Sequence, residues 1–108
     1  MSDNINFGAL LVQMQEDSDR WFGEGTQNNL GVMALGLCGE SGEVADIVKK
    51  LMRGSINISD PNVLDHLQEE LVDVFHYWML LSGMLHLDFH KVYEEKRTFN
   101  ELRFGNGS

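Results

Sequence analysis

The sequence predicts an all-α fold. Apolar residues recur at spacings of three and four along most of the 108 residues, which is the period of an amphipathic helix. No stretch shows the alternation of a strand, and the one proline, Pro61, stands where a helix is expected to start. We expect four to five helices in a helical bundle completed by oligomerisation, because a chain this short buries only about 65% of its unfolded surface.

The length fits a single domain spanning residues 1–108, with flexible ends at 1–5 and 105–108. The first helix is expected from Phe7 to Trp21, because its apolar residues keep largely to one face. The turn-forming residues 22–29 then end it.

A second helix is expected from about Leu30 to Arg53. Its first half is apolar almost all round, which predicts burial on more than one side. Cys38 lies in this run and is interpreted as a small core residue. Its four glycines lower helix propensity, and we expect close approach of a neighbouring helix or ligand to compensate.

A third helix begins with Asp60 as N-cap and Pro61 at its first position. Its spacing predicts a buried stripe made of Leu64, Leu67, Leu71, Val74, Phe75, Trp78, Leu81 and Leu85. A fourth helix follows Asp88 as N-cap and continues to about Arg103.

Eight basic and seventeen acidic residues give a net charge of −9. This excess of acid argues against a protein that binds nucleic-acid backbones, which needs a basic face. The N-terminal residues lack the pattern of a signal peptide, and no apolar run approaches the roughly 20 residues that span a bilayer. We therefore expect a cytoplasmic protein with neither a nucleic-acid nor a membrane partner.

Two pairs of acids lie at helical spacing beside apolar residues. Glu40 and Glu43 share one face of the second helix, and Glu70 and Asp73 share one face of the third. Carboxylates brought together in a dry core would repel one another, and a hard cation such as Mg²⁺ or Mn²⁺ would resolve this. Periodicity alone leaves a metal site and a solvated acidic face equally favoured. A di-iron site is disfavoured, because no histidine follows Glu43 at the required spacing.

These residues resemble a known family. Glu40-x-x-Glu43, a spacer and Glu70-x-x-Asp73, within the segments 34–45 and 69–74, are similar to the signature of the MazG-type all-α nucleoside triphosphate pyrophosphohydrolases. The tail 95–104 is similar to the closing Lys…Asn…Arg-aromatic pattern of that family. One departure is Gly39, where many members carry an additional Glu, and this puts an auxiliary metal contact there in doubt.

The resemblance implies Mg²⁺-dependent hydrolysis of a (deoxy)nucleoside triphosphate to a monophosphate and pyrophosphate, in nucleotide-pool house-cleaning, with Mn²⁺ as a possible substitute. By position, the catalytic metal ligands would be Glu40, Glu43, Glu70 and Asp73, and the phosphate-binding residues would be Lys96, Asn100 and Arg103. Two alternatives remain: a phosphoribosyl-ATP pyrophosphatase-like enzyme of the same fold, and a non-catalytic helical oligomerisation or regulatory module.

Trp21 is a candidate for stacking on the base, with amide contacts from Asn28 or Asn29, although an aromatic residue at a helix end is more often core. The four histidines fall at irregular spacing and are interpreted as surface or helix-end residues. Because the second helix is apolar on too many sides for a monomer, we expect a homodimer or homotetramer with the site near the subunit boundary.

Overall fold

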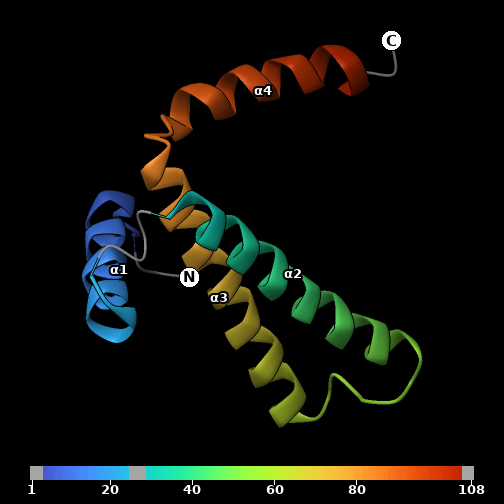
Figure 1. Cartoon of the computed structure of the whole chain (residues 1–108). Helices are drawn as coiled ribbons and strands as arrows, with labels where there is room; N and C mark the ends of the chain where they lie inside the picture. The colour runs from blue at the N-terminus through green and yellow to red at the C-terminus, as the bar shows by residue number, and fades with distance from the viewer. Residues whose placement is uncertain (1–3, 25–28, 106–108) are drawn as a thin grey trace.

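The computed structural model describes residues 4–24 and 29–105 and is all-α in these residues. It contains four helices: α1 (Phe7–Phe22), α2 (Leu30–Met52), α3 (Pro61–Met84) and α4 (Phe89–Phe104) (Figure 1). Each helix starts at a side chain that accepts a hydrogen bond from a backbone N–H of the first turn; these N-caps are Asn6, Asn29, Asp60 and Asp88. The predicted fold class and N-caps Asp60 and Asp88 are confirmed. Most of the expected flexible ends, residues 1–3 and 106–108, lie outside the described residues.

Helix α3 is the centre of the fold, because both α1 and α2 pack against it (Figure 1). Two glycines allow this close packing. A Cβ at Gly36 would overlap the ring of Tyr77, and a Cβ at Gly83 would lie 2.9 Å from Cδ2 of Leu11. The compensation expected for Gly36 is therefore found, since its missing side chain makes room for the aromatic ring from α3.

The core is small and rich in methionine. Met14, Met33, Met79 and Leu80 form its buried cluster. The stripe predicted on α3 is wrong in part, because three of its members are exposed: Leu64 by 39%, Leu71 by 50% and Leu85 by 61%. The physical reason is that, of the helices in the described residues, only α1 and α2 pack along α3, so positions that neither helix faces stay exposed.

The first half of α2 is less covered than expected. Met33 is buried, but Leu35 is 75% exposed. Cys38 is also exposed, so its interpretation as a core residue is wrong. The reason is that α3 covers one side of α2 and α1 does not pack on the other. In the described part of the single chain, the first half of α2 is therefore not buried on more than one side, contrary to the prediction.

Helix α4 extends away from the other three helices (Figure 1). Its first turn touches α3 through the rings of Phe89 and Trp78, whose centroids lie 5.8 Å apart. Every residue of α4 is exposed, so α4 lacks the tertiary packing that supplies most of the stability of helices in proteins. Three helices therefore pack together in the single chain, and completion of a bundle stays a prediction. None of the helices in the described ranges is long and apolar enough to cross a membrane.

Candidate functional site

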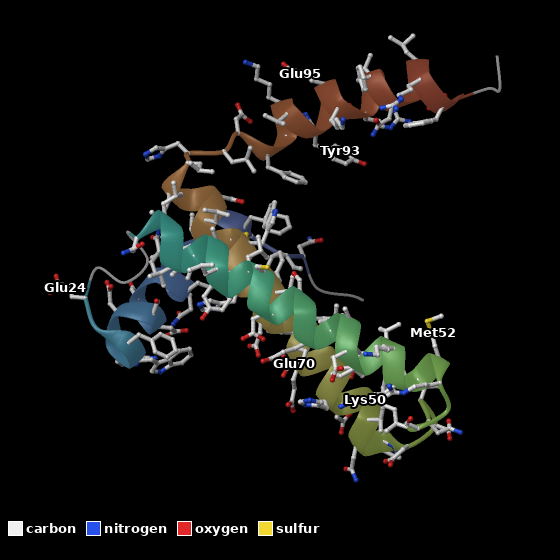
Figure 2. All side chains as sticks on the ribbon, turned by 45° about the vertical axis from the view of Figure 1, so that its right-hand side comes forward. Glu24, Lys50, Met52, Glu70, Tyr93 and Glu95 are labelled. Carbon is white, nitrogen blue, oxygen red and sulfur yellow. The ribbon has the colours of Figure 1, made fainter. Side chains whose placement is uncertain are left out.

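Three of the four predicted acids come together where α2 lies against α3. Glu40 and Glu43 extend from α2 and Glu70 from α3, and one carboxylate oxygen of each lies within 4.8 Å of the others. Figure 2 shows Glu70 at this contact between the two helices. A Cβ at Gly39 or Gly42 would meet no atom within 4 Å, so the surface beside the acids is open to a ligand.

This carboxylate cluster, defined as Glu40, Glu43 and Glu70, is only partly solvated. Glu70 is 9% exposed, and the Oε2 atoms of Glu40 and Glu70 are buried with no hydrogen-bond partner. Buried polar atoms without a partner cost free energy, and buried anions cost more. A solvated acidic face would not hold its carboxylate oxygens in this way.

Mutual repulsion within the cluster is reflected in two pKa values. Burial raises the pKa of Glu40, and the nearby negative charges of Glu43 and Asp73 add to the rise. The pKa of Glu43 is raised chiefly by the carboxylate of Glu70, a like charge that lies within 4.8 Å.

No Lys or Arg among the described residues forms an ion pair with the cluster. The recorded ion-pair contact of the cluster is with a histidine, and Nδ1 of His66 lies 4.0 Å from Oε1 of Glu70. The carboxylate oxygens of the cluster therefore concentrate negative charge that no Lys or Arg of the described residues neutralises. Such a set fits a hard divalent cation, because Mg²⁺ and Mn²⁺ prefer carboxylate oxygens.

Asp73, the fourth predicted ligand, lies beside the cluster and not within it. It is exposed, and with Glu40 it lines a pocket of about 360 Å³ between α1, α2 and α3. Its charge is close enough to raise the pKa of both Glu40 and Glu43. The pocket and the cluster therefore adjoin, with Glu40 belonging to both.

The residues proposed for base binding are placed differently from one another. Trp21, in the last turn of α1, lines this pocket and is 59% exposed. Asn29 caps α2, where its Oδ1 accepts a hydrogen bond from the N–H of Val32 at 3.0 Å. Asn28 lies outside the described residues. The structure therefore places Trp21 at the pocket, whereas the side chain of Asn29 serves as the N-cap of α2.

The three residues proposed for phosphate binding lie on α4, away from the carboxylate cluster. Lys96 and Asn100 line a separate hollow of about 390 Å³ on the helix surface. Nζ of Lys96 lies 4.8 Å from the ring centroid of Phe99, and the guanidinium of Arg103 lies 4.8 Å from that of Phe104. Figure 2 shows α4 well separated from the part of α3 that carries Glu70. Within one chain, the structure does not bring these cations to the acids.

Among the pocket-lining residues that sequence reasoning missed, three carry polar groups: Ser18, His76 and Tyr77. The interpretation of His76 as a surface or helix-end residue is wrong, because it is half-buried in the middle of α3. A signal for it was available, since His76 follows Asp73 by three positions and therefore lies on the same side of the helix.

Comparison with known proteins gives two matches. The family model for the MazG nucleotide pyrophosphohydrolase domain matches residues 28–97, which include the cluster and Asp73. Gene 37 protein of Mycobacterium phage L5 is 35% identical over 74 residues, which cover 68% of this chain and 63% of that relative, less than two thirds of its length. No solved structure matches the chain. The chain belongs to the MazG nucleotide pyrophosphohydrolase domain family.

Proposed function

We propose that this protein hydrolyses nucleoside triphosphates between the α and β phosphates, giving a monophosphate and pyrophosphate, with Mg²⁺ as its cofactor. The observation that carries the proposal is the carboxylate cluster, whose two buried oxygens have no partner. A non-catalytic oligomerisation module would have no use for three converging acids, and their repulsion would weaken it. We further propose that the enzyme removes unwanted nucleotides in the cytoplasm.

The residues of the cluster would hold the metal with Asp73 beside them. When bound, Mg²⁺ would supply charge neutralisation for the triphosphate and a more acidic water. The chain's own contribution is to orient the ligands: Glu40 and Glu43 sit one turn apart on α2, and the packing of α3 fixes Glu70 opposite them. Asp73 lies next to this position, where it can complete the ligand set or accept a proton from water.

The direct test is to measure pyrophosphate release from a panel of ribo- and deoxynucleoside triphosphates. We expect release with Mg²⁺, a similar result with Mn²⁺, and none with EDTA. Products should be the monophosphate and pyrophosphate, which separates this reaction from removal of the γ phosphate. Absence of pyrophosphate from every nucleotide, with either metal present, would contradict the proposed activity.

We also propose that a second copy of the chain covers α4 and completes the site. Four of the eight basic residues lie in α4, whereas fourteen of the seventeen acids lie elsewhere; these basic residues are Lys91, Lys96, Arg97 and Arg103. Within residues 4–24 and 29–105, no other helix packs along α4, so its cations and exposed aromatic rings are available to an acidic neighbour. In a homodimer in which α4 reaches the partner's carboxylate cluster, the cations of α4 would offset the charge of the cluster and the exposed face of α4 would be covered. A homotetramer would consist of two such dimers.

Mixing two inactive variants tests this arrangement. One variant carries Glu70→Gln and the other Lys96→Ala, and neither is expected to be active alone. If the lysine acts on the partner's cluster, half of the randomly mixed dimers contain one intact site, which gives about a quarter of wild-type activity. The measurement is pyrophosphate release after co-expression or co-refolding, with light scattering to establish the oligomeric state.

The same mixture gives a different result if each chain uses its own α4. No site in the mixed dimer would then contain both Glu70 and Lys96, and the mixture would stay inactive. A monomer of 12.3 kDa by light scattering would also contradict the proposal.

A further inference from the structure

We propose that His76 is a specificity-determining residue that hydrogen-bonds the nucleobase of the substrate. This inference rests on the proposed function and concerns the pocket between α1, α2 and α3. The carboxylate cluster and this pocket share Glu40, so a nucleotide whose phosphates reach the cluster extends its nucleoside end into the pocket.

The size and walls of the pocket suit a nucleoside. Its volume of about 360 Å³ lies near the lower end of the range for small-molecule sites, which is too small for an entire nucleoside triphosphate. Most of its walls are apolar or aromatic, and they consist of Trp21, Phe22, Val32, Met33, Tyr77 and Leu80. The rings of Trp21 and Phe22 are exposed at one end, where a planar base can stack on them.

Four non-aromatic or imidazole polar side chains line the same pocket, beside Trp21 and Tyr77, which carry an indole N–H and a phenol hydroxyl on their rings. Glu40 and Asp73 belong to its acidic end, beside the cluster, so of these four Ser18 and His76 are the ones available to the base, and His76 is the one that offers a donor and an acceptor on one rigid ring. A neutral imidazole offers one N–H donor and one nitrogen acceptor, so it can pair with an edge that presents both kinds of group. The hydroxyl of Ser18 can rotate to donate or to accept a hydrogen bond, so it discriminates less between different bases.

The ring of His76 contacts a neighbouring side chain, but its nitrogens take no part in that contact. Its recorded interaction within the described ranges is an edge-on contact with the ring of Tyr77, at 6.1 Å between centroids. Tyr77 is itself seated against Gly36, where a Cβ would overlap its ring. The contact with Tyr77 is made by the ring of His76 and not by its nitrogens, which leaves both nitrogens for a ligand.

The experiment compares the steady-state kinetics of wild type, His76→Ala and His76→Asn over nucleoside triphosphates with different bases. For the preferred base, we expect His76→Ala to raise KM by about tenfold, the loss expected for one hydrogen bond in a semi-enclosed site. The kcat, and the KM for disfavoured bases, should change less than about twofold. Asn keeps a donor and an acceptor, so His76→Asn should restore part of the preference.

Two controls separate reading of the base from other roles. His90→Ala alters an exposed histidine on α4 outside the pocket and should leave the base preference unchanged. Inhibition by inorganic tripolyphosphate with Mg²⁺ should be the same in wild type and His76→Ala, because tripolyphosphate has no base. Binding of a non-hydrolysable nucleotide, followed by quenching of Trp21 fluorescence, should weaken in His76→Ala in parallel with KM.

The possible failures are distinguishable. If wild type hydrolyses nucleotides but His76→Ala keeps the same preference among bases, the inference is wrong and the proposed function stands. An equal loss of kcat for every base would place His76 at the reacting phosphates and would also overturn it. If wild type hydrolyses no nucleotide, the proposed function itself fails.

Discussion

Substitution Glu70→Gln is expected to lower pyrophosphate release by at least about 100-fold without unfolding the protein. Loss of groups that merely support metal ligands already costs 10- to 100-fold, and Glu70 is proposed as a ligand itself. Glu70 is the most buried member of the cluster, and its Oε2 has no hydrogen-bond partner. Gln has nearly the same shape, so the packing of α3 against α2 should be retained.

The effect on stability distinguishes this prediction from a simple loss of structure. Without metal, Glu70→Gln removes one of three like charges that lie within 4.8 Å, so the variant should be at least as stable as wild type. Circular dichroism should show unchanged helicity, and urea unfolding should show an equal or higher midpoint.

Glu69→Gln is the matched control, because Glu69 is the exposed neighbour on the same helix and lies outside the cluster. It should keep nearly full activity. Asp73→Asn is expected to lose activity as well, since its charge acts on Glu40 and Glu43. Near-normal turnover by both Glu70→Gln and Asp73→Asn would contradict their assignment as metal ligands.

Local signals in the sequence predicted the helices well. The N-caps Asp60 and Asp88 and the helix-starting Pro61 each define a boundary through interactions within a few residues. The pairing of Glu40 with Glu43 follows from the helical period alone. The sequence could predict these features because none of them depends on how the helices pack.

Features that depend on packing were predicted less well. Leu71 fits the periodic pattern yet is exposed, whereas Glu70 is buried beside it, because the direction from which α2 approaches α3 decides which side is covered. The direction from which α2 approaches α3 also decides that His76 lines the pocket. The separation of Lys96 from the cluster was not foreseeable either, since it depends on the turn at residues 85–88 that directs α4 away from α3.

Mg²⁺ is expected to raise the melting temperature of wild type strongly and that of Glu70→Gln little. A ligand that binds only the folded state at 100 times its Kd stabilises it by about 2.7 kcal/mol. For a domain of this size, such a gain corresponds to a rise of roughly 10 to 20 °C. Thermal unfolding with Mg²⁺ or EDTA measures the difference, and equal melting temperatures for wild type in both would contradict a metal site.

The dependence on pH should have opposite signs with and without the metal. The pKa values of Glu40 and Glu43 are raised in the folded protein, so the folded state holds protons that the unfolded state has already lost. Without metal, the free energy of unfolding contributed by these groups therefore falls as pH rises above about 4.5, and it levels off above their raised pKa values. With Mg²⁺, the deprotonated carboxylates are the binding form, so stability rises over the same range.

Without metal, Asp46 makes a contribution to the free energy of unfolding that rises with pH, because the hydrogen bond and charge of Lys50 lower its pKa. Its contribution is lost as pH falls toward that lowered pKa. It lies outside the cluster and should be nearly the same with Mg²⁺ and with EDTA, so the difference between the two curves isolates the cluster. The curves should converge in acid and diverge toward neutral pH. Parallel curves would mean that Mg²⁺ binds away from Glu40 and Glu43, because only binding to those carboxyls competes with their protons.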